Sequence, residues 1–356
     1  MKIGIAYSLA PPAADRPPDG PDDRYEEFDK PETVEAIAAA IRADGHDVAL
    51  LGDGREFLTR VLVDPPAFVF NIAEGEGVGR SREARVPAAC EMLGIPYSGS
   101  DPWTMATCLD KWATRRVVAL RYVHASTPYD RHRGDVGRAW LLPAAIEAGV
   151  AELAAAYDDP ATEVPRLIFK PACEGSSKGI RGTCLADRRD EAIATYRRLA
   201  EDYRQPILAE EFIDGEEITV GLVGNGGGRG GDALGEPWIM RIVPNDRGEP
   251  FVYSLEVKRD WQSRVTYEAP ALLPEAIGRA IAAAAVAAFE ALDCRDFARI
   301  DFRVRDGVPY FIEANPLPGL APGTSDLVIM AERYGIGYGE LVRKILKAAL
   351  ARVGLA

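Results

Sequence analysis

The segment of residues 297–327, FARIDFRVRDGVPYFIEANPLPGLAPGTSDL, constrains the fold of this chain more than any other. Apolar and polar residues alternate before and after an Asp-Gly pair, which indicates a β-hairpin with one buried face. The apolar rows are Ile300, Phe302 and Val304 before the turn, and Val308, Tyr310 and Ile312 after it. For both rows to share a face, the residue numbers of two residues paired across the strands must add up to an even number. A two-residue turn does not allow this, so we expect a three-residue turn, 305–307, with a left-handed Gly307.

The opposite face of this hairpin would carry four polar residues, Arg299, Asp301, Glu313 and Asn315. Mg²⁺ takes oxygen ligands from one or two carboxylates and completes its shell with phosphate oxygens and water, and Mn²⁺ accepts similar ligands. Asp301, Glu313 and Asn315 therefore predict a metal site that serves a polyphosphate, with Arg299 beside it for a developing anion. The alternative is a hairpin whose charged face only meets solvent.

The segment that follows the hairpin, NPLPGLAPGTSD, is apolar and rich in Gly and Pro. This composition predicts a wall for a small substrate, which Thr324 and Ser325 would contact, rather than a solvent loop. The backbone N–H of Gly319 could meet a negative oxygen there.

A second candidate site is KPACEGSSKG, residues 170–179. Glycines let backbone N–H groups approach oxygen closely, serines donate hydrogen bonds, and Lys170 and Lys178 bring positive charge, as a phosphate lid requires. Gly-Ser loops are common, so this signal alone is weak. It gains specificity because a predicted strand ends at Lys170 and the metal hairpin lies downstream.

The motifs RIDF and FIEANPLPG closely resemble the carboxy-terminal metal hairpin of the ATP-grasp enzymes, and in particular of the D-alanine:D-alanine ligases. The resemblance covers most of the chain from about residue 67 onwards. It implies an α/β protein with the ATP-grasp fold and an amino-terminal parallel α/β lobe. The expected lobes are residues 1–108 on the substrate side, 109–205 with the phosphate lid, and 206–356 with the metal hairpin.

The resemblance also implies which residues bind ATP. Lys111, in an Asp-Lys pair, Lys170 and the EGSS loop would hold the phosphates, whereas ILAEEFIDGEEITV resembles the hinge that reads adenine and ribose. The implied ATP contacts are Lys111, Lys170, Ser176, Ser177, Glu210, Phe212, Ile213, Glu217, Lys258 and Ile312. The implied catalytic group is Arg299, Gly319, Lys258 and Ser176. A solvated helix lysine and an acidic hairpin edge are the simpler alternatives for Lys111 and the hinge.

The chain departs from the family where the first substrate would be chosen. Arg259 stands where the alanine ligases have a tyrosine, and the amino-terminal glutamate motif that binds the substrate ammonium is replaced by PDDRYEEFDKPET. We therefore expect a first site with added positive charge, which would disfavour D-alanine and favour an acylated, amine-free or more acidic substrate. Carboxylates that could restore the ammonium site are Glu27, Asp29 and Glu74, and Asn71 precedes the same predicted cleft.

The remaining chain reads as alternating strands and helices, beginning with a small parallel α/β lobe that ends near residue 108. Further expectations are a helix at 143–156, a hairpin from strands 206–211 and 216–223, a strand at 251–258 and a closing helix at 332–350. The glycine-rich segment 224–236 lacks the GK[ST] ending of a phosphate loop and is interpreted as a surface hairpin tip.

Composition excludes several classes of function. A net charge of −13 argues against a nucleic-acid or anionic-membrane surface. Five cysteines without metal-ligand spacing indicate a reduced, cytoplasmic protein, and the sequence shows neither a signal peptide nor a membrane segment.

These observations predict an ATP-dependent ligase that joins a small carboxylate to an amine through an acyl phosphate, as a D-alanine:D-alanine ligase-like enzyme does. The alternatives are a ligase for other amino acids or small carboxylic acids, a kinase that stops at the phosphorylated acid, and a non-catalytic nucleotide-binding module. The resemblance also implies a homodimer formed through the first lobe.

Overall fold

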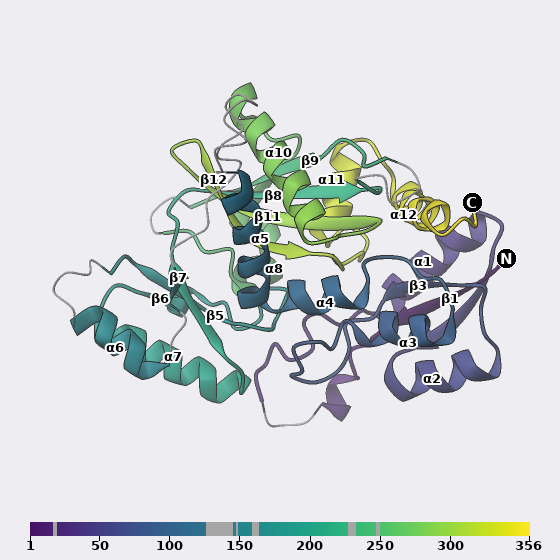
Figure 1. Cartoon of the computed structure of the whole chain (residues 1–356), viewed down its shortest axis with the longest axis horizontal. Helices are drawn as coiled ribbons and strands as arrows, with labels where there is room; N and C mark the ends of the chain where they lie inside the picture. The colour runs from purple at the N-terminus through teal and green to yellow at the C-terminus, as the bar shows by residue number, and fades with distance from the viewer. Residues whose placement is uncertain (17–19, 126–144, 147–148, 159–163, 227–232, 247–249) are drawn as a thin grey trace.

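The computed structural model describes the chain except residues 17–19, 126–144, 147–148, 159–163, 227–232 and 247–249. Its strands form three sheets, which Figure 1 shows as three bodies around a common centre. The cavities described below lie where these bodies meet.

The amino-terminal lobe is a parallel sheet of order β2-β1-β3 with helices packed against it. Strand β1 is IGIA at its centre and is buried on both faces, as a parallel sheet covered by helices requires. The elements of this lobe are β1 (Lys2–Tyr7), α1 (Pro31–Ala43), β2 (Asp47–Gly52), α2 (Gly54–Val63), β3 (Phe68–Ile72) and α3 (Arg85–Leu93), with a 3₁₀ turn at Ala13–Asp15. The predicted parallel α/β lobe is confirmed.

The central lobe is an antiparallel sheet of order β4-β7-β5-β6, with α6 and α7 on one face (Figure 1). Two helices, α4 (Pro102–Leu109) and α5 (Lys111–Ala125), lead into it. Its elements are β4 (Ala145–Ile146), α6 (Val150–Asp158), β5 (Leu167–Pro171), a 3₁₀ turn at Gly182–Cys184, β6 (Leu185–Ala186), α7 (Arg189–Tyr203) and β7 (Ile207–Glu211). The helix expected at 143–156 therefore starts only at Val150. Residues 145–146 are strand, Gly149 is not helical, and residues 143–144 and 147–148 lie outside the described residues.

The predicted hairpin between residues 206–211 and 216–223 is wrong. Strand β7 pairs with β5 in the central sheet, whereas β8 (Glu216–Val223) lies between β9 and β11 in the next sheet. The four residues between them therefore carry the chain from one lobe to the other. We propose that the central lobe extends to about residue 211 rather than 205.

The carboxy-terminal lobe is an antiparallel sheet of order β10-β9-β8-β11-β12. Its elements after β8 are β9 (Trp238–Pro244), α8 (Leu255–Arg259), α9 (Trp261–Arg264), β10 (Val265–Glu268), α10 (Glu275–Ala291), β11 (Phe297–Arg305), β12 (Val308–Asn315), α11 (Asp326–Arg333) and α12 (Tyr338–Arg352). The strand predicted at 251–258 is wrong, because its second half is helix α8. Glu256 in the first turn and Lys258 with Arg259 in the last complement the helix dipole, a signal that competes with the strand-like alternation. The predicted closing helix is divided into α11 and α12.

The hairpin of β11 and β12 turns through two residues, so the predicted three-residue turn is wrong. Asp306 and Gly307 both have positive φ, 54° and 76°, as a type I′ turn requires. The register shifts between Asp301 and Phe302, where Ile312 is the extra residue of a β-bulge. The extra residue of the bulge brings Asp301 opposite Glu313 and Arg299 opposite Asn315. The predicted three-residue turn would have placed the same four side chains on one face.

The polar face of the hairpin is the predicted one. Arg299 pairs with Asn315 and Asp301 with Glu313, so all four side chains lie on one face. The apolar row of β12 differs from the prediction. Phe311 and Ala314 join Ile300, Phe302 and Val304 in the core, whereas Val308, Tyr310 and Ile312 are only half-buried.

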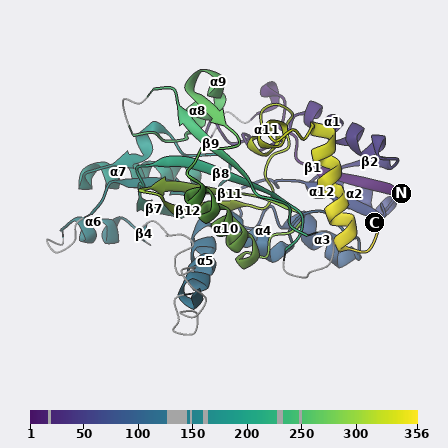
Figure 2. The ribbon, with the colours of Figure 1, turned by 90° about the horizontal axis from the view of Figure 1, so that it is seen from above.

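Helix α12 returns to the amino-terminal lobe and packs against α1, so the two chain ends lie near each other in both views (Figures 1 and 2). All five cysteines are buried and free, as expected for small core residues. Within the described ranges, no helix has both the length and the apolar character needed to cross a bilayer.

Candidate active site

Two adjoining cavities lie where the lobes meet. The larger cavity, of about 450 Å³, is bounded by the loop after β1, the EGSS loop and the segment 316–326. The smaller cavity, of about 70 Å³, lies between β5, β7 and the hairpin. Tyr253, Lys258 and Glu313 line both cavities, so the polar face of the hairpin stands at their junction.

The predicted metal donors lie together at this junction. Asn315 Nδ2 is 3.2 Å from Asp301 Oδ2 and 3.4 Å from Glu313 Oε1. Arg299 donates from Nε and Nη2 to the two oxygens of Asp301, at 3.0 and 2.8 Å. Two carboxylates and an amide on one face form a donor set that fits a hard divalent cation such as Mg²⁺.

The electrostatic surroundings keep one of these carboxylates ionised. Burial alone would raise the pKa of Glu313, but Lys111 and Arg299 lower it to about 2. Burial raises the pKa of Asp301, although Arg299 opposes this shift. The site thus holds one firmly ionised carboxylate and one that still lacks full compensation of its charge.

The smaller cavity contains the residues of the predicted hinge. Glu210 is buried, and its carboxylate accepts from Lys170 and, at 2.9 Å, from Arg115. Phe212 and Ile213 follow on the short crossing between lobes, and both are buried. The alternative of an acidic hairpin edge at the surface does not fit Glu210, which is buried.

Glu217 and Ile312 complete the smaller cavity from the neighbouring lobe. Arg303 Nε lies 3.0 Å from Glu217 Oε2, and the same guanidinium lies over the Phe212 ring at 4.7 Å. Burial raises the pKa of Glu217, and Arg303 only partly offsets it. A ligand with hydroxyl donors would provide the missing partners for this carboxylate.

The two serines of the EGSS loop have an unusual backbone conformation. Ser176 and Ser177 are consecutive non-glycine residues with positive φ, 47° and 59°, which is rare and strained. Lys111 donates to the carbonyl oxygen of Glu174 and lies 3.6 Å from Glu313. The predicted phosphate-binding residues thus converge on the junction of the two cavities.

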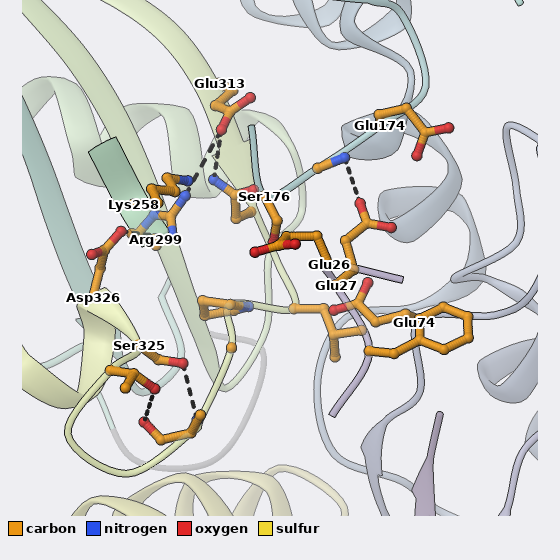
Figure 3. A pocket seen from close by; sticks show the side chains of 18 of the residues that line it. Glu26, Glu27, Glu74, Glu174, Ser176, Lys258, Arg299, Glu313, Ser325 and Asp326 are labelled. Carbon is orange, nitrogen blue, oxygen red and sulfur yellow. Dashed lines mark hydrogen bonds and ion pairs between the residues drawn. The ribbon is translucent and has the colours of Figure 1, made fainter. Parts of the chain in front are cut away.

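Glu27 connects the loop after β1 to the EGSS loop. It accepts from the Gly175 N–H at 2.6 Å, from Arg82 Nη2 at 2.6 Å and from Lys178 Nζ at 3.1 Å. Burial disfavours its ionisation, but Arg82 and Lys178 hold the pKa of Glu27 below its usual range. Figure 3 shows Glu26, Glu27 and Glu74 on one side of Ser176, opposite Arg299 and Asp326.

Arg259 does not add free positive charge to the larger cavity, so the expectation of a cationic first site is wrong. Its guanidinium contacts Glu26 at 2.7 Å and Asp22 at 3.1 Å, both in the loop after β1. This pairing could not be predicted, because the partners lie more than 230 positions apart in the chain.

All three predicted carboxylates, Glu27, Asp29 and Glu74, line the larger cavity, and the predicted amide does not. Burial raises the pKa of Asp29 to about 7, and burial with the nearby Glu83 and Glu27 raises the pKa of Glu74 well above its usual range. Asn71 is buried elsewhere, where its side-chain oxygen accepts from the Ala73 N–H at 3.1 Å. Asn71 is therefore a turn-stabilising residue rather than a substrate contact.

The segment 316–326 forms the opposite wall, as predicted, with Gly319, Thr324 and Ser325 lining it. Ser325 Oγ accepts from the Ala321 N–H at 3.0 Å, which fixes the loop (Figure 3). Sequence reasoning missed an aromatic and acidic group on this side, Tyr253, Trp261, Tyr267 and Asp326. Asp326 follows directly on the GTS motif, which is the one signal that could have singled it out.

Comparisons with known proteins identify the family. Residues 159–347 match the family model described as the D-ala D-ala ligase C-terminus. The chain is 30% identical over 327 residues to a D-alanine–D-alanine ligase from Cupriavidus metallidurans, covering 88% of this chain and 85% of that protein. The chain belongs to the D-alanine–D-alanine ligase family.

Solved structures agree on the fold of this ligase family member. The crystal structure of D-alanine–D-alanine ligase from Bacillus anthracis has a TM-score of 0.68 and 22% identity, with 100% of both chains covered. The same enzyme complexed with ATP has a TM-score of 0.65 and 21% identity, with 99% of both chains covered. The predicted ATP-grasp fold is therefore confirmed, and the match to relatives named D-alanine–D-alanine ligase confirms the predicted class of ATP-dependent ligase.

Proposed function

We propose that this ligase binds ATP in the smaller cavity and joins two small molecules in the larger one. Glu210 and the crossing residues Phe212 and Ile213 would meet the adenine, and Glu217 the ribose hydroxyls. This assignment is supported by the position of all four residues around one cavity, by the burial of Glu210, Phe212 and Ile213, and by the raised pKa of Glu217.

The triphosphate would extend toward the cavity junction, where Lys111, Lys170, Lys258 and the two serines of the EGSS loop converge. Asp301, Glu313 and Asn315 would hold Mg²⁺, which would supply charge neutralisation for the phosphates. Phosphoryl transfer demands positioning and charge stabilisation more than a protein base, and this set of side chains provides both.

The reaction has two steps. A carboxylate oxygen of the acid substrate attacks the γ-phosphorus, the bond to the bridging β–γ oxygen breaks, and ADP leaves an acyl phosphate. A neutral amine then attacks the acyl carbon, the C–N bond forms, the C–O bond to phosphate breaks, and the nitrogen loses its proton to phosphate or water. Arg299 and the Gly319 N–H would stabilise the oxyanion between these bond changes.

The acid substrate would be an amino acid whose ammonium faces Glu27 and Glu74. These two residues would offer acceptors from a different direction than the altered amino-terminal motif: Glu27 is ionised but paired with Arg82 and Lys178, and a bound ammonium would favour the ionised form of Glu74. The ion pairs of Arg259 with Glu26 and Asp22 leave the ammonium unopposed. D-alanine is the first candidate because relatives that align over most of the chain are named for it.

The observation that carries this proposal is the convergence of Arg299, Asp301, Glu313 and Asn315 at the junction of two cavities. It is tested by ADP release with pools of D- and L-amino acids, each with and without hydroxylamine. Hydroxylamine traps acyl phosphates as hydroxamates, so it separates a ligase from a kinase that releases its phosphorylated acid. Absence of ADP release with every pool would reject the proposal.

We also propose a cytoplasmic location, supported by five free cysteines, and a homodimer. Exposed apolar side chains on α2, among them Leu62 at 65% and Val63 at 81%, are suited to an interface through the amino-terminal lobe. Light scattering after size exclusion tests the oligomeric state.

A further inference from the structure

One wall of the larger cavity carries a buried carboxylate that the proposed reaction does not use. Asp326 begins helix α11 and is 8% exposed. Its Oδ2 accepts from Arg299 Nη1 at 3.3 Å, and its Oδ1 accepts from the Tyr253 hydroxyl at 3.2 Å. Tyr253 in turn shares a 2.6 Å hydrogen bond with Tyr267, so the carboxylate is fixed in place.

The guanidinium of Arg299 is already occupied by carboxylates of the chain itself. Its Nε and Nη2 donate to the two carboxylate oxygens of Asp301, and its Nη1 donates to Asp326. A substrate carboxylate binds arginine best through two N–H groups of one edge. Neither edge is left for such a contact, and the remaining Nη2 donor faces the reacting centre, 3.8 Å from Glu313.

Some of the other cations around the larger cavity are already paired. Arg259 is paired with Glu26 and Asp22. Lys111 donates to the carbonyl oxygen of Glu174 and lies 3.6 Å from the Glu313 carboxylate. Among the described residues that line the cavity, Lys30 and Lys258 are the cations without an ion pair. Lys30 is exposed at the rim, and Lys258 lies between the two cavities, 5.0 Å from the Tyr253 ring.

We propose that Asp326 determines the amine substrate, and that this substrate carries no carboxylate beside its amine. Asp326 places its own negative charge beside Arg299 and near the start of a helix, where a substrate carboxylate would otherwise bind. The aromatic side chains Tyr253, Trp261 and Tyr267 would then enclose a neutral or cationic body. This inference rests on the proposed ligase function and specifies the class of its second substrate.

A purely structural role for Asp326 is the competing explanation. A carboxylate in the first turn of α11 complements the helix dipole and would stabilise the fold whatever the substrate. The two explanations differ in their effect on substrate choice. Only a specificity role makes the ratio of kcat/KM between two amines depend on this residue.

The experiment compares D-alanine with D-alaninamide as the amine, at a saturating concentration of the acid substrate that gives most ADP release. The two probes differ only in a carboxylate against a carboxamide, and the products are separated by mass. For the wild-type chain we expect kcat/KM for the amide to exceed that for the acid by roughly tenfold or more, because like charges about 4 Å apart repel.

Asp326→Asn should lower this preference for the amide by about tenfold, since it removes one charge and keeps the side-chain shape. Glu332→Gln removes an exposed carboxylate from the same helix and should leave the ratio unchanged. A wild-type chain that prefers D-alanine would overturn the inference, whether or not the variant folds. So would an unchanged ratio in a folded Asp326→Asn. Loss of all ADP release in the wild type would instead reject the ligase proposal itself.

Discussion

At the scale of single residues, the site is organised by how each buried charge is compensated. Arg299 forms ion pairs with Asp301 and Asp326. Lys170 forms an ion pair with Glu210, and Lys111 lies close to Glu313. These pairs stand in a cavity wall, where a lost partner leaves an uncompensated charge. Substitutions that keep shape and remove charge are therefore the sharpest tests.

Glu313→Gln should retain the fold, because the residue lines a polar cavity, but should lower the turnover of ADP release by roughly 100-fold or more. The pKa of Glu313 is about 2, so the wild-type carboxylate is charged at any working pH and contributes its full charge. Glu332→Gln is the matched control. Wild-type turnover in Glu313→Gln with an unchanged Mg²⁺ requirement would reject the metal assignment.

Asp29 should make the stability of the ligand-free chain depend on pH. Burial raises its pKa to about 7 from an ordinary value near 3.8, and the neighbouring Glu74 and Tyr338 offer no positive charge. Between these two values the folded state binds more protons than the unfolded state, so the contribution of Asp29 to stability falls as pH rises from about 4 to 7.

Asp29→Asn should therefore raise the melting temperature relative to the wild type at pH 8 and have less effect at pH 4. Paired thermal melts at the two pH values measure this difference, with Asp44→Asn, an exposed site, as the control. An equal change in melting temperature at both pH values would show that Asp29 does not titrate in this range.

At the scale of secondary-structure elements, the sequence predicted those whose local signals agree. Alternation located β11 and β12, and the polar row of Arg299, Asp301, Glu313 and Asn315 was correct because opposing carboxylates have no place in a core. The turn length was wrong because a bulge at Ile312 can supply the same parity. The alternation of polar and apolar residues requires one extra residue somewhere in the hairpin. It does not say whether that residue lies in the turn or in a bulge.

Pairings between distant segments could not be predicted. Residues 206–223 contain two β-rich runs separated by Asp-Gly, which is the local pattern of a hairpin, yet β7 and β8 belong to different sheets. Partner choice depends on which sheet offers a free edge, and no short window holds that information. The pairing of Arg259 with Glu26 was missed because these residues also lie far apart in the chain. The charge predicted for the first-substrate site was therefore too positive.

The loop after β1 should hold the EGSS loop closed even without nucleotide. Asp23 is buried and accepts from the Gly179 N–H at 2.9 Å and the Tyr203 hydroxyl at 2.7 Å. Asp23→Ala would leave these donors unpaired and should speed hydrogen exchange in residues 174–180, because local opening becomes less costly. Asp190→Ala, whose side chain is 96% exposed on α7, is the control. Equal exchange in both variants would contradict a closing role for this contact.

At the scale of the whole molecule, the lobes are joined around one buried carboxylate, Asp296. It accepts from the Gly99 N–H at 2.8 Å in the amino-terminal lobe and from Asn225 at 3.0 Å in the carboxy-terminal lobe. Arg352 at the end of α12 reaches it with Nε at 2.9 Å and Nη2 at 2.8 Å, and also donates to the carbonyl of Tyr97. The chain end thus closes the first and last lobes onto each other.

Arg352→Ala should destabilise the folded chain by about 3 kcal/mol, since it leaves a fully buried carboxylate without its countercharge. Calorimetry should show a lower melting temperature, and the amino-terminal lobe should lose protection from hydrogen exchange first because its contact with α12 is weakened. Adding Asp296→Asn to this variant removes the stranded charge and should recover part of the lost stability. If the double variant is as unstable as the sum of its two single variants, the two residues do not act as a pair, and the joining of the lobes must rest on the packing of α12 against α1 instead.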